Sequence, residues 1–216
     1  MTGQRGKVAT VAETSGSPQH TPEWYADRLG KVTGSRVNAV VTGGKGATRA
    51  ALLSQLVAER LTGQPTETFT SEAMEWGTEQ EPHAINAYSA KTGNLVESAP
   101  FVPHPTIEMA GASPDGYVND DALIEVKCPS TKTMLEYILD QKVPTAYLNQ
   151  IQFQLAVTGR QHCDFVAYDP RLPPNLQLLI IRVERDDKRI AELETETIKF
   201  LAEVEAQVTK LKEMQL

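Results

Sequence analysis

The sequence predicts one α/β domain with a small mixed sheet flanked by helices. Helical segments with apolar stripes come first, and short strand-like segments and helices then alternate along the rest of the chain. One strand-like segment, residues 122–128, is apolar except for Glu125 and Lys127, and we expect it near the centre of the sheet. A chain of 216 residues also favours one full core over two domains.

The composition is ordinary for a globular protein, with 40% hydrophobic and 23% charged residues. No apolar run approaches the ~18 residues that span a bilayer, and no charged-then-apolar leader stands at the N-terminus. We therefore expect a soluble intracellular protein with no membrane partner. The net charge of -7 disfavours general affinity for nucleic acid, although a local basic channel can coexist with an acidic exterior.

The cysteines and histidines show no pattern of a zinc site or a disulfide framework. Cys128 and Cys163 lie apart in two apolar stretches, which is typical of buried thiols. The four histidines lack the close spacing of metal ligands. The sequence therefore predicts a protein without zinc.

The ordered domain is expected over residues 21–216, after a flexible tail at residues 1–20 that is rich in Thr, Ser, Gly and Gln. Thr21 can cap a short helix that Gly30 ends, and Ser35 is expected to cap a second helix over residues 36–41. Arg28 and Ser35 are plausible phosphate ligands, because one offers a fork of donors and the other a helix N-terminus. A surface arginine and an ordinary cap are the alternative.

Two longer helices are predicted next. Residues 43–46 lack the spacing of a phosphate loop and are expected to form a flexible loop before a helix over residues 48–62. A second helical region over residues 71–92 places Glu81 on the face expected to meet the core. Pro82 predicts a kink or a new helix start at that point, and a surface position for Glu81 stays open.

The remaining elements complete the α/β pattern. Short strands are expected at residues 95–96 and 99–102, and helices at residues 133–139 and 145–158. Strands at residues 163–168 and 176–183, separated by a Pro-rich turn, precede a long amphipathic helix over residues 186–214. That helix is expected to pack on the domain, with an oligomer seam as the alternative.

The stretch from Gly111 to Pro129 carries the candidate chemistry. Asp115 follows a Ser-Pro turn, and a polar reversal at residues 119–121 would bring it beside Glu125. A strand places Glu125 and Lys127 on one face. The result would be a paired-carboxylate cradle next to an amine, suited to Mg2+ and to a phosphodiester substrate. Taken alone, this pattern is equally compatible with a turn residue and a solvated ion pair.

Several segments resemble one family, and they occur in that family's order. The segments are Trp24-x3-Arg28-Leu29-Gly30-x2-Thr33-x-Ser35, Trp76-Gly77-x3-Glu81, Ser113-Pro114-Asp115-Gly116, Glu125-Val126-Lys127-Cys128-Pro129, Tyr147-x2-Gln150-x-Gln152 and Tyr168-Asp169-Pro170-Arg171. Together they resemble the lambda exonuclease type, the YqaJ-like viral recombinase nucleases of the PD-(D/E)xK superfamily. The resemblance implies a restriction-endonuclease-like core with a central mixed sheet flanked by helices.

The resemblance also implies a 5′ to 3′ exonuclease that degrades one strand of duplex DNA. It would release 5′-mononucleotides and leave a 3′ single-stranded overhang for recombination. Two Mg2+ ions per active site, with Mn2+ as an alternative, would be held by Asp115, Glu125 and the backbone carbonyl of Val126. Lys127 would orient or activate the attacking water, and Glu81 and Gln150 would help to position water and substrate.

Further sites and partners follow from the same resemblance. Arg28, Ser35 and Ser113 resemble a pocket for the terminal 5′-phosphate, with Gln150 also at the DNA. Met74 occupies the place of an apolar wedge that separates the strands in relatives, although core packing is the usual role of such a methionine. The family implies a homotrimer ring around DNA ends, a phage single-strand annealing protein as partner, and the cytoplasm of a bacterial or phage-infected cell.

Three rival functions stay open. The first is an endonuclease or nickase of the same superfamily, which would share the metal site and differ in how it handles strands. The second is a catalytically inactive module that binds DNA ends. The third is an α/β domain with no nucleic-acid role, which requires every matching segment to be coincidental.

Overall fold

A computed structural model describes residues 19, 21–41, 46–66 and 71–215 of the chain. The predicted tail over residues 1–20 lies outside the described residues except for Gln19, and so do residues 43–45 of the predicted loop. Gln19 donates from its side-chain amide to the backbone oxygens of Pro114, at 2.7 Å, and Ala99, at 3.3 Å. The domain thus holds the start of the described chain next to Asp115.

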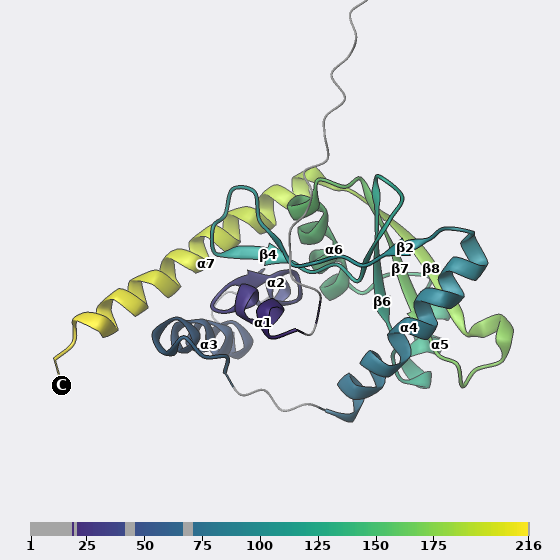
Figure 1. Cartoon of the computed structure of the whole chain (residues 1–216), viewed down its shortest axis with the longest axis horizontal. Helices are drawn as coiled ribbons and strands as arrows, with labels where there is room; N and C mark the ends of the chain where they lie inside the picture. Colours follow the sequence, from purple (N-terminus) through teal and green to yellow (C-terminus); the bar gives the residue numbers. More distant parts are fainter. Residues whose placement is uncertain (1–18, 20, 42–45, 67–70, 216) are drawn as a thin grey trace, which may run out of the picture.

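A five-stranded mixed sheet forms the centre, in the order β2-β5-β6-β7-β8 (Figure 1). Its strands are β2 (Val96–Glu97), β5 (Gly116–Val118), β6 (Ala122–Lys127), β7 (His162–Tyr168) and β8 (Leu178–Glu184). Strand β6 pairs antiparallel with β5 and parallel with β7. The predicted mixed sheet is confirmed, and the strand that carries Glu125 and Lys127 is its middle strand.

A second, three-stranded sheet in the order β1-β4-β3 was not expected from the sequence as a separate sheet. It consists of β1 (Val32–Thr33), β4 (Ala110–Ala112) and β3 (Val102–Pro103). Gly111 in β4 needs its missing side chain, since a Cβ would lie 2.3 Å from the Phe101 ring and 2.6 Å from the Val102 oxygen. Strand β4 ends just before Ser113 and therefore leads the chain toward the central hairpin.

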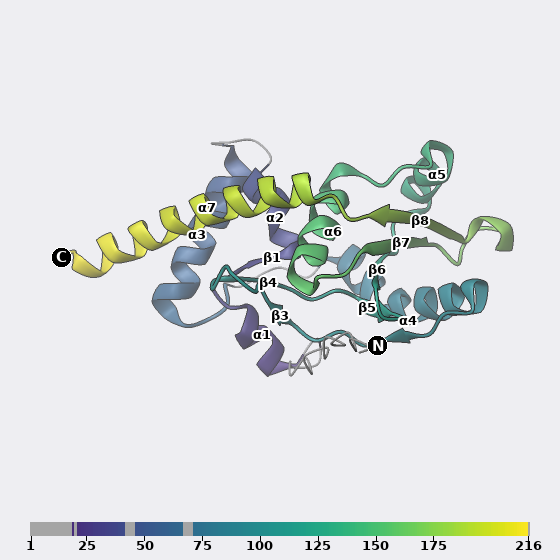
Figure 2. The ribbon, with the colours of Figure 1, turned by 90° about the horizontal axis from the view of Figure 1, so that it is seen from above.

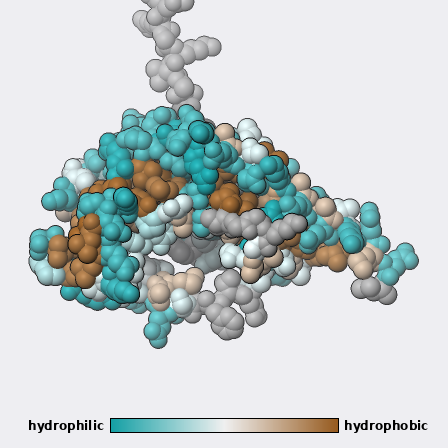
Figure 3. Space-filling view, turned by 180° about the vertical axis from the view of Figure 1, so that it is seen from behind, coloured by the Kyte–Doolittle hydropathy of each residue, from teal (hydrophilic) through white to brown (hydrophobic). Residues whose placement is uncertain are grey.

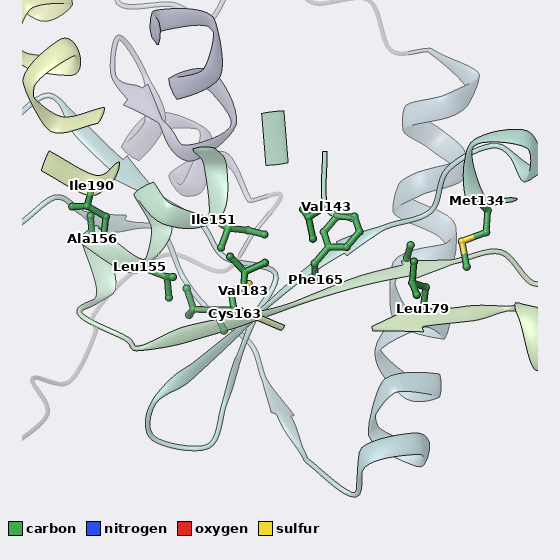
Figure 4. Packing of buried hydrophobic residues seen from close by; sticks show 12 residues of the cluster. Met134, Val143, Ile151, Leu155, Ala156, Cys163, Phe165, Leu179, Val183 and Ile190 are labelled. Atoms are coloured by element: carbon green, nitrogen blue, oxygen red, sulfur yellow. The ribbon is translucent and has the colours of Figure 1, made fainter. Parts of the chain in front are cut away.

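Helices cover both faces of the central sheet (Figure 2). On one face, α4 (Glu72–Thr92) buries Ala84 and Tyr88 against Ile124 and Val126. On the other face, α5 (Thr131–Asp140) and α6 (Thr145–Thr158) pack on the sheet. Figure 4 shows this second core, in which Met134, Ile151 and Leu155 of the helices meet side chains of β7 and β8.

The remaining helices lie beside the small sheet. They are α1 (Pro22–Arg28), α2 (Gly34–Val41), α3 (Ala47–Thr62) and α7 (Asp187–Glu213), with a short 3-10 helix, η1 (Pro174–Leu176), before β8. A hydrophobic core between these helices includes Val40, Leu56, Phe200 and Val204. Two of them, α2 and α7, also pack on α6. The far end of α7 extends away from the sheet (Figure 1). Seen from behind that view, the surface is mainly hydrophilic with hydrophobic patches (Figure 3).

The predicted start of the second helix was wrong. The second helix starts at Gly34, so Ser35 lies within its first turn instead of capping it, and its hydroxyl lies 3.3 Å from that of Thr33. Helix α4 runs from Glu72 to Thr92 through Pro82 without a new start, capped by Ser71. Of the two outcomes expected at Pro82, a new helix start is therefore absent.

None of the helices within the described residues combines the length and the apolar character needed to cross a membrane.

Candidate active site

The hairpin of β5 and β6 brings Asp115 beside the middle strand. Asn119 adopts a left-handed conformation with φ 50°, which the turn requires and which Asn tolerates. The register pairs Gly116 with Ile124, so its continuation brings Asp115 opposite Glu125 of β6. Its Oδ2 accepts a hydrogen bond of 2.7 Å from the backbone N–H of Val126. The predicted convergence of Asp115 on the Glu125 segment is therefore present.

Glu125 is fully buried and receives hydrogen bonds on both carboxylate oxygens. The Gln150 amide donates to Oε1 at 2.6 Å, and the Gln154 amide donates to Oε2 at 2.8 Å. The Lys127 ammonium forms an ion pair with Oε1. A buried carboxylate is costly unless it is paired and hydrogen-bonded, and these donors also fix the plane of the group.

Helix α6 supplies both amides because Gln150 and Gln154 are spaced by four residues and share one helix face. Gln154 is completely buried, and α2 packs closely over it: a Cβ on Gly34 would lie 3.4 Å from Gln154 Cγ. Its Oε1 is buried without a hydrogen-bond partner among the described residues. Gln154 was not predicted as a site residue, and its four-residue spacing from Gln150 is the signal that could have found it.

The electrostatics couple the acidic groups and the lysine. Burial, then the neighbouring Glu125, raises the pKa of Asp115 well above its usual range, and Glu81 raises it further. Burial alone would lower the pKa of Lys127, but Glu125 and Asp115 outweigh that effect and raise it. The negative charges of these carboxylates therefore repel one another, and the Lys127 ammonium offsets part of that repulsion. A bound cation between the carboxylates would reduce the repulsion further.

The donor set fits a hard divalent cation. Two carboxylates converge, and Val126, whose carbonyl is a further candidate ligand, follows Glu125 directly and lines the adjacent pocket. Oxygen ligands of this kind suit Mg2+, which keeps several waters and takes few protein ligands. In the part of the chain that the structure describes, no group of three or more His, Cys, Asp or Glu side chains is arranged to hold an ion. The fit therefore rests on the Asp115 and Glu125 pair and not on a closed cage.

A pocket of about 490 Å³ opens between the end of β6 and the first half of α4. Lys127 and Val126 line one side, and Met74 and Glu81 line the other. Glu81 also borders a smaller pocket together with Asp115. Met74 is 56% exposed, so it is a surface side chain at this pocket and not part of the core. The structure thus places both Glu81 and Met74 at this pocket.

Two of the predicted phosphate ligands, Arg28 and Ser113, are in contact with each other. Ser113 accepts hydrogen bonds from Arg28 at 3.0 Å and from the Trp24 indole at 2.9 Å, and the Arg28 guanidinium stacks 4.1 Å from the Trp24 ring centroid. Burial, then the nearby Arg36, lowers the pKa of Arg28 to about 10. Ser35 lies in the first turn of α2, and the only hydrogen bond described for its side chain is the one with Thr33.

The chain matches known proteins over most of its length. The model of the YqaJ-like viral recombinase domain matches residues 23–161. An alkaline exonuclease, LHK-Exo from Laribacter hongkongensis, is 50% identical with a TM-score of 0.85, and the match covers 89% of this chain and 96% of that one. The complex of LHK-Exo with dAMP matches equally well, at 51% identity and a TM-score of 0.85 over the same shares of both chains.

A more distant likeness supports the fold alone. A phage related exonuclease from Haemophilus somnus 129PT is 15% identical with a TM-score of 0.70, covering 84% of this chain and 96% of that one. A search of curated proteins found no match. The resemblance and the fold class predicted from the sequence are confirmed. The chain belongs to the YqaJ-like viral recombinase family and is a nuclease with the PD-(D/E)xK fold.

Proposed function

We propose that this nuclease is a Mg2+-dependent 5′ to 3′ exonuclease acting on duplex DNA ends. It releases 5′-mononucleotides and leaves a 3′ single-stranded overhang for recombination by strand annealing. The observation that carries the proposal is the convergence of Asp115 on the buried, hydrogen-bonded Glu125 beside Lys127. The complex of LHK-Exo with dAMP, a 5′-mononucleotide, supports the nature of the product.

Asp115, Glu125 and the Val126 carbonyl would hold two Mg2+ ions, with Mn2+ able to replace them. Nucleases of this type generally depend on divalent metal ions. When bound, such ions lower the pKa of a water molecule and stabilise the charge on a leaving oxygen. The raised pKa of Asp115 supports this assignment, since a cation would relieve the repulsion that Glu125 exerts on it.

The protein's own side chains orient the reaction. Lys127 keeps its ammonium beside Glu125 and supplies positive charge where the phosphate gathers negative charge. Gln150, which holds Glu125 Oε1, and Glu81, at the pocket rim, would position water and substrate. Because Glu125 is held on both oxygens, its position is set before substrate arrives, and little reorganisation is needed during the reaction.

Arg28 and Ser113 would bind the terminal 5′-phosphate, with Ser35 at the start of α2 as a further ligand. The Arg28 guanidinium is already oriented by Ser113 and the Trp24 ring, which suits recognition of a phosphate. Met74, exposed at the pocket, would act as the wedge that separates the strands. The enzyme would work in the cytoplasm as a homotrimer ring on DNA ends, together with a single-strand annealing protein.

A digestion with Mg2+ tests this proposal. Linear duplexes labelled at either the 5′ or the 3′ end, with 5′-phosphate or 5′-hydroxyl termini, are compared with closed circular DNA. We expect the 5′ label to be released first, as mononucleotides, with faster digestion of phosphorylated ends. Closed circles should stay intact. Cut or nicked circles would indicate an endonuclease or nickase, and bound but uncut duplex would indicate an inactive end-binding module.

A further inference from the structure

Asp169 and Arg171 form a cluster next to the pocket that has no role in the proposed chemistry. The cluster joins the loop after β7 to α5 and α4. Asp169 lies just after β7 and is fully buried. It accepts hydrogen bonds from the Thr131 hydroxyl at 2.7 Å and from the Arg171 backbone N–H at 3.0 Å. The carboxylate thereby ties the start of α5 to the loop that follows β7.

Arg171 is fixed in one orientation by this carboxylate. Its Nε donates to Asp169 Oδ1 at 2.7 Å, and its Nη2 donates to Oδ2 at 3.1 Å. Nη2 also donates to the Pro129 carbonyl at 3.1 Å. A two-point pair of this kind sets the plane of a guanidinium. That plane stacks on the ring of Trp76 in α4, 4.5 Å from its centroid.

Among the described residues, the first half of α4 is less buried than the second half. The fully buried residues of α4, Ala84 and Tyr88, lie in its second half, whereas Glu72 to Glu75 are exposed. Pro82 lacks the N–H that would bond to the carbonyl one turn earlier, which weakens the link between the halves. Trp76 is the large half-buried side chain of the first half, and its indole N–H is buried without a hydrogen-bond partner in the described structure.

This half of α4 forms a wall of the pocket. On this side the pocket is lined by Ala73, Met74, Gly77 and Thr78. The opposite side includes Lys127, at the end of β6, and Pro129, which follows the strand. Arg171 contacts both sides, because it holds the Pro129 carbonyl and the Trp76 ring at once. Arg171 therefore links the two sides of the pocket at this end.

We infer that Arg171 is a positioning residue that clamps Trp76 and thereby sets the α4 wall against which the terminal nucleotide binds. Arg171 does not touch the candidate catalytic groups, and it acts through the placement of Met74 and Gly77. The part of this inference that concerns substrate rests on the proposed nuclease function. The part that concerns the helix does not, so the two can be tested separately.

The test compares Arg171→Lys with wild type, because lysine keeps the charge but loses the planar fork and the stack. Backbone hydrogen exchange is followed in residues 74–80 and in residues 84–90 of α4. We expect exchange in residues 74–80 to rise about tenfold and exchange in residues 84–90 to stay unchanged. On linear duplex with Mg2+, KM should rise about tenfold while kcat changes less than about twofold.

Matched variants separate the clamp from general stability. Arg182→Lys alters a comparable half-exposed arginine of β8, which pairs with Asp164 of β7 at 3.3 Å, and should leave exchange in residues 74–80 and KM unchanged. Trp76→Phe keeps an aromatic face and should show a smaller effect than Trp76→Leu. In a double-mutant cycle, Arg171→Lys should add little once Trp76 is Leu.

The outcomes are distinct. Unchanged exchange in residues 74–80 of Arg171→Lys, or additive effects in the cycle, would overturn the clamp. Locally raised exchange with unchanged KM would overturn the assignment of this wall to substrate. A wild-type protein without nuclease activity would count against the proposed function and against the substrate role, while the exchange experiment would still decide the clamp.

Discussion

The two walls of the candidate active site are held in different ways. The sheet wall presents Glu125, which is completely buried and bound by Lys127, Gln150 and Gln154. The helix wall, the first half of α4, is largely exposed and is fastened through the half-exposed pair of Arg171 and Trp76. The Glu125 carboxylate is thus fixed by buried hydrogen bonds, whereas the contact of Arg171 with Trp76 that supports the helix wall lies near the surface.

The largest effect is expected from breaking the carboxylate pair on the sheet wall. Asp115→Asn keeps the size of the side chain and an oxygen for the Val126 N–H, but it removes the charge. We expect loss of Mn2+ binding in calorimetry and loss of turnover, because a hard cation needs the carboxylate. Asp120→Asn, in the exposed turn of the same hairpin, is the control and should behave as wild type.

The same variant has a predictable pH dependence. Burial and Glu125 raise the pKa of Asp115 in the folded, metal-free protein, so stability is lost as the pH rises from the ordinary carboxyl pKa of the unfolded chain to the raised pKa of the folded protein. In chelator, Asp115→Asn should therefore melt above wild type at alkaline pH, and the difference should vanish as the pH falls. Each 1 kcal/mol corresponds to about 2–4 °C in Tm. A lower Tm for the variant at every pH would contradict this electrostatic account.

Lys127→Ala should separate chemistry from binding. We expect turnover to fall by about 10²–10³-fold, the loss typical of one missing charge-stabilising donor. Mn2+ binding should be equal or tighter, because the variant removes a positive charge from beside Glu125. Lys132→Ala, at an 88% exposed side chain on α5, is the control for lysine loss. Weaker Mn2+ binding in Lys127→Ala would show that the lysine organises the metal site instead.

Gln154→Leu probes the support behind Glu125. It removes the donor to Oε2 while keeping a buried side chain of similar size, so Glu125 can rotate. The affinity for Mn2+ should fall by about 10–100-fold, as is common when a partner of a metal ligand is lost. Gln152→Leu removes another buried amide of α6, which binds Glu184 and Asp186, and should lower stability alone. Equal Mn2+ affinities in the two variants would rule out the special role of Gln154.

A smaller and more selective effect is expected at the phosphate side of the site. Arg28→Ala should reduce the preference for 5′-phosphorylated over 5′-hydroxyl ends by about tenfold, which corresponds to about 1.4 kcal/mol. Arg49→Ala is a matched control, since Arg49 also stacks on an aromatic ring, that of Phe200. An equal loss of activity on 5′-phosphorylated and 5′-hydroxyl ends would contradict a role for Arg28 in phosphate recognition.

The sequence predicted the elements that depend on local signals. Thr21 caps α1, Gly63 and Gly93 end α3 and α4 with positive φ, and the reversal at residues 119–121 forms as expected. The strand with Glu125 and Lys127 was recognised because period-two alternation and its two charges are local features. Asp115 could be placed beside it because a hairpin fixes register.

Other features depend on contacts that the sequence does not display. Gly34, at the start of α2, packs closely on Gln154 of α6, and the small sheet forms by pairing of β1 with the distant β4. Gln154 acts on Glu125 across two elements, and Arg171 reaches Trp76 from 95 residues away along the chain. Such pairings become visible only when the helices are placed on the sheet.

The central claim is that Asp115 and Glu125 bind shared divalent ions, and anomalous diffraction from crystals soaked in Mn2+ tests it most directly. The account predicts anomalous density between the two carboxylates in wild type and none in Asp115→Asn. Manganese bound elsewhere, or carboxylates that stay apart with no density between them, would contradict it.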